Sequence, residues 1–182
     1  MVEGVKPIDI RQFYVIFKNL EHDGSFDITS YPSDVYNCIA FAMGFEDRWV
    51  DFNTDEEGHW WPPIPEKDFR PSSLIAAFEY MGFERCNDGV VEDGFDKVAL
   101  YKVDEQSDPW IPEHWTHAAR IIESGVCHSK IGRWYDIHHR DGDVFQGSIY
   151  GNIYQYMKRP VSLRNIVEQF SSGDDCDFEI KY

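Results

Sequence analysis

A cysteine stands where a short apolar helix is expected to begin, in the segment YNCIAFAMG at residues 36–44. Asn37 is a favourable N-cap residue, because its side-chain oxygen can accept hydrogen bonds from the free N–H groups of the first turn. Gly44 suits the left-handed position that closes a helix. Cys38 would then lie in the first turn, where the positive end of the helix dipole favours thiolate over thiol. A cysteine hydrolase presents its nucleophile in this way.

Two other interpretations of Cys38 stay open. Free cysteine is among the most buried residue types, so a cysteine in an apolar helix is commonly part of the core. The helix could also begin earlier, with Ser33 as its cap after Pro32. Cys38 would then lie a full turn inside the helix, and the helix dipole would act on it less strongly.

A cysteine nucleophile needs a base that takes its proton and a polar group that orients this base. His117 is the best placed of the seven histidines, at the head of the segment THAARII, which we expect to form a strand. The interval of 79 residues from Cys38 to His117 has room for a second helix and one strand. A helix-borne cysteine, a strand-borne histidine and a polar residue on the next strand follow one another in this order in papain-like hydrolases.

The third residue of such a site depends on the register of the hairpin that carries His117. Ser129 follows His117 by twelve residues, a spacing similar to that of the NlpC/P60 branch of the papain-like superfamily. A two-residue turn would bring His128 and Lys130 to the face of His117, whereas a three-residue loop would bring Ser129 there. We favour Ser129, because a lysine is a poor partner for a cationic imidazole. Asp136, in the connection that follows, is the other alternative.

Two tryptophans lie in a segment that cannot form regular structure. Residues 59–65 read HWWPPIP, and the three prolines exclude a helix or a central strand. Tryptophan side chains require burial or a ligand. We expect a loop that packs over the core, with Trp60 and Trp61 as one wall of a cleft. Together with Lys130, they are the side chains that we expect to contact a substrate.

The remaining segments predict an α+β fold in which helices pack on an antiparallel sheet. We expect one domain over residues 1–182, with a core at about 10–160 and a C-terminal helix and acidic tail at 161–182. Leu74, Ala77 and Phe78 should face strands carrying Val98, Leu100 and Ala119. The expected elements are a strand or short helix at 10–17, a helix from Ser72 or Ser73 to Gly82, strands at 97–103, 116–122, 126–131 and 150–159, a charged connection at 134–143, and a last helix at 165–170.

Seven sequence blocks resemble a family of uncharacterised bacterial proteins, common in cyanobacteria, that carry a domain of unknown function. The blocks cover residues 17 to 160 roughly, and are DITS at 27–30, YNCIA at 36–40, WWPP at 60–63, GFDKVALY at 94–101, HAAR at 117–120, SKIG at 129–132 and YG at 150–151. The resemblance implies a papain-like, NlpC/P60-like fold and marks Cys38, His117 and Ser129-Lys130 as motif positions. It implies no activity, because the family has none assigned.

The chain departs from this family at several positions. Cys127 and Phe41 stand where the family has tryptophan, and Ile121 stands where it has glutamine. The segment after Pro160 has no counterpart in the family pattern.

Charge and composition exclude several classes of partner. The formal net charge is −16, so the chain would repel a nucleic-acid duplex, whereas a basic protein or peptide is an acceptable partner. The four cysteines form no CxxC pair, and no apolar run resembles a signal peptide or a membrane span. We therefore expect a cytoplasmic protein with reduced thiols and no membrane partner, although export by a route without a leader stays open.

We expect neither a metal nor a cofactor. Residues 136–143 carry aspartates and histidines of metal-ligand type, but adjacent histidines in a charged connection are typically solvated. Phosphate-binding glycine loops and the Rossmann fingerprint are missing from the sequence.

Two hypotheses for the function follow. In the first, the chain is a cysteine peptidase, amidase or deamidase with a Cys38–His117 dyad, assisted by Ser129 and by an oxyanion donor. The donor would be the Cys38 backbone N–H, with the Asn37 side chain if that side chain does not cap the helix. In the second, the chain is a non-catalytic papain-like protein, such as an inhibitor, an immunity protein or a defence-related adaptor, that binds through an acidic surface.

Overall fold

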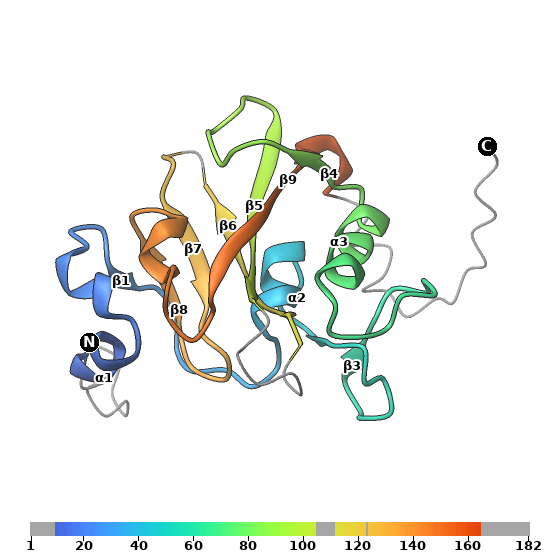
Figure 1. The fold of residues 1–182 in the computed structure, drawn as a ribbon, viewed down its shortest axis with the longest axis horizontal. Helices are drawn as coiled ribbons and strands as arrows, with labels where there is room; N and C mark the ends of the chain where they lie inside the picture. Colours follow the sequence, from blue (N-terminus) through green and yellow to red (C-terminus); the bar gives the residue numbers. More distant parts are fainter. Residues whose placement is uncertain (1–9, 105–111, 123, 165–182) are drawn as a thin grey trace.

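A seven-stranded sheet dominates the computed structural model, which describes residues 10–104, 112–122 and 124–164 (Figure 1). The strand order is β1-β8-β7-β6-β5-β9-β4, and every neighbouring pair is antiparallel. The strands are β1 (Asp27–Ile28), β4 (Glu84–Cys86), β5 (Phe95–Val103), β6 (His114–Ile121), β7 (Cys127–Lys130), β8 (Asp136–His139) and β9 (Asn152–Pro160). Two short strands, β2 (Trp49–Val50) and β3 (His59–Trp60), form a separate parallel pair.

The helices cover both faces of this sheet. They are α1 (Arg11–Ile16), α2 (Cys38–Met43) and α3 (Pro71–Tyr80), together with the 3₁₀ helices η1 (Lys18–His22), η2 (Gly142–Phe145) and η3 (Val161–Leu163). In Figure 1, α2 and α3 lie near each other beside β5 and β9, and α1 lies at the end of the sheet that carries β1. The α+β class with an antiparallel sheet is therefore confirmed.

The face covered by α2 and α3 holds the larger part of the core. Helix residues such as Ile39, Leu74 and Phe78 are fully buried there, against strand residues that include Leu100 and Ala118. The predicted packing of Leu74, Ala77 and Phe78 against Val98 and Leu100 agrees with this cluster.

The opposite face has its own core, which the sequence did not predict. Phe13 and Phe17 of the N-terminal helices and Phe145 of η2 pack there against Tyr101 and Ala119. Ala119 was expected beside the helix residues of the first face, and that expectation is wrong. Successive residues of a strand point to opposite faces, so Ala118 lies on the face of α2 and Ala119 on the other.

Several predicted boundaries need correction. Of the two alternatives expected at residues 10–17, the short helix is confirmed, as α1 (Arg11–Ile16). Helix α3 begins with Pro71 and not with a serine cap, because the hydroxyl of Ser73 donates to Asp68. The charged connection at 134–143 contains the strand β8, whose pattern DIHH does not alternate in the usual way. The helix predicted at 165–170 lies outside the described residues.

The hairpin of β6 and β7 has the three-residue register. Arg120 pairs with His128, Ile121 with Cys127, and the N–H of Ile122 donates to the carbonyl of Val126. Gly125 closes the loop with a φ of 80°, a value that glycine adopts without strain. Ser129 therefore lies on the same face of the sheet as His117. None of the helices in the described part of the chain has the length and apolar character needed to cross a bilayer.

Candidate functional site

Cys38 is the first residue of α2, as the capping pattern predicts. The Asn37 side-chain oxygen accepts from the N–H of Ala40 at 2.9 Å and from that of Val50 at 3.3 Å, and its amide nitrogen donates to the Val50 carbonyl at 2.8 Å. Gly44 ends the helix in the left-handed conformation. The Asn37 side chain caps the helix, so the condition under which it was expected to serve as an oxyanion donor is not met.

The thiol of Cys38 is protected in this conformation. The residue is 9% exposed, and burial raises the pKa of its thiol to about 11. The other influences lower the pKa: hydrogen bonds to backbone groups of Ala118, Ile39 and Cys38 itself, and the charge of Lys130. The resting group is therefore a neutral thiol, surrounded by groups that would stabilise its thiolate.

The contact between Cys38 and Ala118 coincides with a gap in the strand ladder. The register of β6 with β7 consists of two residue pairs near the loop, Arg120 with His128 and Ile121 with Cys127. Ala118 lies beyond these pairs, and its backbone hydrogen-bonds to the Cys38 sulfur instead. The start of α2 is thereby held against β6 at the point where β6 and β7 diverge.

His117 belongs to a buried chain of hydrogen bonds on the other face of the sheet. Its Nε2 lies 3.2 Å from the Ser129 hydroxyl, which lies 2.9 Å from Nε2 of His139. Nδ1 of His139 lies 2.7 Å from the carbonyl oxygen of Asp141. His117, Ser129 and His139 are all fully buried. Ser129 is thus the polar group that orients His117, as the three-residue register requires.

This chain of bonds fixes where each proton lies. A carbonyl oxygen only accepts, so His139 carries its proton on Nδ1, and its Nε2 accepts from the Ser129 hydroxyl. The Ser129 oxygen then accepts from Nε2–H of His117. Burial lowers the pKa of His139 to about 4 and that of His117 well below its ordinary value, so both rings are neutral. Nδ1 of His117 is therefore unprotonated, and it has no hydrogen-bond partner among the described residues.

Cys38 and His117 lie on opposite faces of β6 and are not a hydrogen-bonded pair in this conformation. His117 precedes Ala118, whose backbone contacts the Cys38 sulfur. Tyr150 stacks on the His117 ring, with centroids 4.0 Å apart, and also interacts electrostatically with Cys38. Within the described side chains, however, no hydrogen bond joins the thiol to the imidazole, because Nε2 of His117 is bonded to Ser129 and Nδ1 has no partner.

Lys130 and Asp136 lie on the α2 face of the sheet, away from His117. Lys130 is fully buried, donates to the Trp134 carbonyl at 2.6 Å and lies 5.1 Å from the centre of the Tyr36 ring. Asp136 accepts from the Tyr36 hydroxyl at 2.7 Å. Burial lowers the pKa of Lys130. Lys130 therefore acts on Cys38 through its charge, and its burial does not support the expected substrate contact.

The two tryptophans pack against other aromatic side chains. Trp61 is 4% exposed, donates to the Glu66 carbonyl at 2.9 Å and stacks on Trp115. Trp60 packs against Phe45. The expectation that residues 59–65 have no regular structure is wrong for His59 and Trp60, which form the strand β3, and neither of the two cavities described includes either tryptophan. A substrate contact from Trp61 is therefore not supported.

Sequence reasoning missed His139 and Tyr150 as members of the site. His139 was grouped with possible metal ligands, yet its ring points to the face of Ser129, whereas the cross-strand pair of His128 and His138 lies on the face of α2. The signal that could have found it is the register of β8, which pairs Ser129 with Ile137 and leaves His139 two residues along the same face. Among the described residues, no three His, Cys, Asp or Glu side chains are arranged to hold a metal ion.

The fold and the site together define an α+β protein with a cysteine in the first turn of a helix on one side of a strand and a buried chain of hydrogen-bonded histidines on the other. Comparison with protein families assigns the chain to a family. The chain belongs to the family described as "Domain of unknown function (DUF7689)", whose model matches residues 27–158. This confirms the expected membership in an uncharacterised domain family. Comparisons with curated proteins and with solved structures gave no match.

Proposed function

We propose that this chain is a papain-like, cysteine-dependent hydrolase of amide bonds, with Cys38 as nucleophile and His117 as base. The observation that carries the proposal is the relay from the Asp141 carbonyl through His139 and Ser129, which leaves Nδ1 of His117 unprotonated and without a partner. An imidazole oriented through one nitrogen, with a free lone pair on the other, is what a cysteine nucleophile requires of its base.

The order of elements supports the papain-like assignment. Cys38 begins a buried helix, His117 lies on a strand of the antiparallel sheet that this helix packs against, and Ser129 lies on the next strand. Peptide, isopeptide or glutamine amides are the substrates that such a site would attack.

In the reaction, the Cys38 sulfur would attack the amide carbonyl while its proton moves to Nδ1 of His117. The backbone N–H of Cys38 would donate to the developing oxyanion. His117 would then protonate the leaving amine, and water would release the acyl group from the sulfur. Because Cys38 is 9% exposed and His117 lies on the opposite face of the sheet without a hydrogen bond to it, the reaction requires a conformational step that admits the substrate and rearranges β6 so that sulfur and Nδ1 meet.

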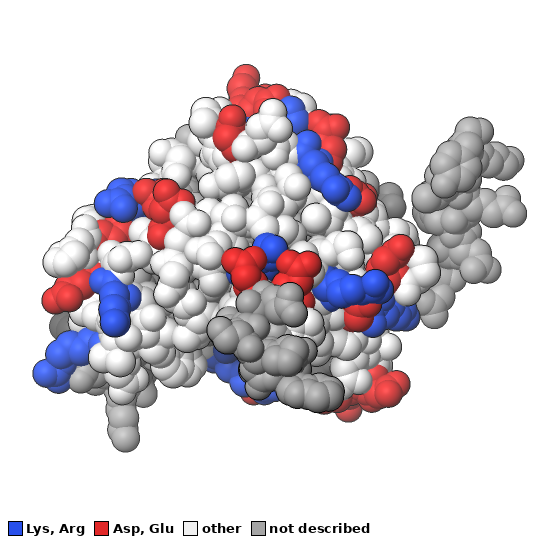
Figure 2. Space-filling model, in the orientation of Figure 1, with Lys and Arg blue, Asp and Glu red and all other residues white. Residues whose placement is uncertain are grey.

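The second candidate is a non-catalytic papain-like protein that binds a protein or peptide. The observation that favours it is the protected thiol, with its raised pKa and its lack of a hydrogen bond to His117. The net charge of −16 favours a basic partner. On the face shown in Figure 2, however, acidic and basic side chains are interspersed and form no single acidic patch.

Alkylation of Cys38 distinguishes the two candidates. The native protein is treated with iodoacetamide at pH 7, and labelling of Cys38 is followed by peptide mass spectrometry, since other cysteines are present. A hydrolase predicts that His117→Gln slows the labelling of Cys38 by about 10²-fold, the usual contribution of a general base. His128→Gln is the matched control, because His128 is a partly buried histidine on the other face. Equal rates in the wild type and His117→Gln would exclude the dyad and leave the binding protein.

A further inference from the structure

A cavity of about 680 Å³ lies at the C-terminal end of α2, whereas Cys38 lies at the N-terminal end of that helix. Strands β5, β6 and β9 contribute to its walls, and the apolar part is formed by Val91, Phe95, Val98, Ile121, Ile122 and Val161. The charged residues lining it are Lys97, Arg120, Arg159 and Arg164, against Glu92, Asp93 and Asp96. Four cations thus face three carboxylates, although the whole chain has an excess of acidic residues.

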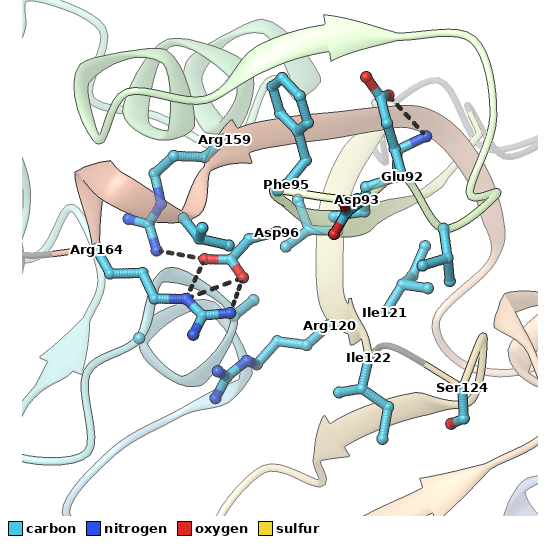
Figure 3. A pocket seen from close by; sticks show the side chains of 17 residues that line it. Glu92, Asp93, Phe95, Asp96, Arg120, Ile121, Ile122, Ser124, Arg159 and Arg164 are labelled. Carbon is cyan, nitrogen blue, oxygen red and sulfur yellow. Dashed lines mark hydrogen bonds and ion pairs between the residues drawn. The ribbon is translucent and has the colours of Figure 1, made fainter.

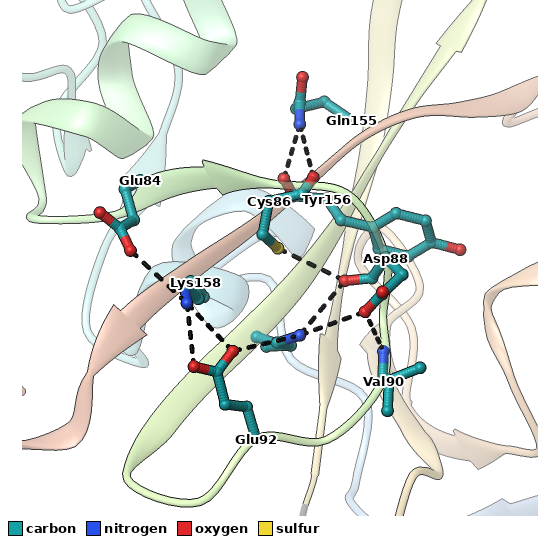
Figure 4. A network of polar contacts seen from close by, with 9 residues as sticks. Glu84, Cys86, Asp88, Val90, Glu92, Gln155, Tyr156 and Lys158 are labelled. Carbon is teal, nitrogen blue, oxygen red and sulfur yellow. Dashed lines mark hydrogen bonds and ion pairs between the residues drawn. The ribbon is translucent and has the colours of Figure 1, made fainter.

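Two of the three carboxylates are already neutralised. Asp96 accepts from Arg164 at 2.8 Å and from Arg159 at 3.5 Å, and Figure 3 shows these three side chains together with Arg120 converging on one side of the cavity. Glu92 accepts from Lys158 at 2.9 Å (Figure 4), and Lys158 does not line the cavity. These pairs leave little acceptor capacity for the other cations of the lining.

Arg120 and Arg159 keep hydrogen-bond donors without acceptors. Within the described part of the chain, the guanidinium of Arg120 forms no hydrogen bond or ion pair, and it lies 5.2 Å from the centre of the Phe41 ring. Arg159 is 3% exposed, and its Nε has no hydrogen-bond partner. Buried donors are almost always satisfied in folded proteins, so the unmet Nε of Arg159, together with the unpaired guanidinium of the half-buried Arg120, indicates a ligand that accepts hydrogen bonds.

We propose that this cavity binds a small molecule with one carboxylate group and an apolar body. The carboxylate would accept from Arg120, whose planar guanidinium matches it with two parallel hydrogen bonds. The apolar body would cover Ile121, Ile122 and Val91. A single negative charge balances the lining, whereas a dianion such as phosphate would exceed this balance and would be repelled by the unpaired Asp93. The site is independent of Cys38 and of the proposed hydrolase.

Calorimetric titration of the full chain with hexanoate tests the proposal. Hexanol is the neutral probe of the same length, and inorganic phosphate is the dianionic probe. We expect 1:1 binding of hexanoate, weakened about tenfold or more by Arg120→Gln, because hydrogen bonds to charged groups are the strong ones. Arg85→Gln, at an exposed arginine paired with Glu79 outside the cavity, should leave the affinity unchanged.

A variant that removes a negative charge from the cavity provides a second test. Asp93 is exposed at the cavity and has no ion pair among the described residues, so Asp93→Asn should tighten hexanoate binding while leaving the fold intact. The proposal is overturned if hexanoate does not bind, if hexanol or phosphate binds as well as hexanoate, or if Arg85→Gln weakens binding as much as Arg120→Gln.

Discussion

Removal of the Ser129 hydroxyl should destabilise the fold far more than the loss of one surface oxygen would. Ser129 is fully buried and bridges two neutral imidazoles at 3.2 and 2.9 Å. In Ser129→Ala, Nε2–H of His117 loses its acceptor and Nε2 of His139 loses its donor. Each buried polar group left without a partner costs about 1–3 kcal/mol, so two such groups predict a loss of about 2–6 kcal/mol.

Urea denaturation at pH 7 measures this loss, with the slope of the transition compared between variants to confirm a common unfolding reaction. Ser124→Ala is the matched control, since Ser124 is exposed in the loop between β6 and β7, and its effect should stay within about 0.5 kcal/mol. A cost for Ser129→Ala as small as that of the control would refute the relay, and with it the assignment of the free lone pair to Nδ1 of His117.

Two further predictions concern stability. Burial holds the pKa of His139 and of His128 at about 4, below the ordinary 6.5, so the unfolded chain binds protons first as the pH falls. The free energy of unfolding should therefore be highest above pH 6.5 and should decline towards pH 4, by about 3 kcal/mol for His139 alone. Urea denaturation at pH 7, 6 and 5 measures this decline, and equal stability at the three pH values would contradict the prediction. Phe78→Ala removes a fully buried ring of α3 and should lower the free energy of unfolding by about 3–5 kcal/mol. Val15→Ala, at an exposed side chain, is the control and should change it by no more than about 0.5 kcal/mol. A loss below about 1 kcal/mol for Phe78→Ala would show that Phe78 does not face the core.

The parts of the site that depend on a few adjacent residues could be predicted from the sequence. The start of α2 follows from Asn37 as cap and Gly44 as terminator, and both act within one segment. For the hairpin of β6 and β7, the sequence allowed two registers. The structure has the register in which Ser129 faces His117. A one-residue change of register reverses the face of every side chain, so sequence alone could not select it.

The parts that depend on distant segments could not be predicted. Strand β8 buries Asp136 and His139, and a strand with a buried carboxylate and a buried imidazole lacks the hydrophobic pattern by which strands are recognised. The second core was missed for a related reason: Phe13 and Phe145 lie far apart in the chain, and only the tertiary structure brings them onto one face. The cavity arginines likewise come from three separate elements, so no sequence spacing identifies them.

The balance of forces on Cys38 explains how a protected thiol and a proposed nucleophile can be the same group. Burial is the cause that raises its pKa, whereas the backbone groups of Ala118 and Ile39 and the charge of Lys130 all lower it. A movement that exposes the sulfur to a substrate, while these contacts persist, removes the raising influence and keeps the lowering ones. The thiol would then become acidic only in the state that admits a substrate, and His117, neutral at rest, would be ready to take the proton. Under the proposed function, the closed conformation therefore protects the thiol from unspecific reaction, and the opening step controls its reactivity.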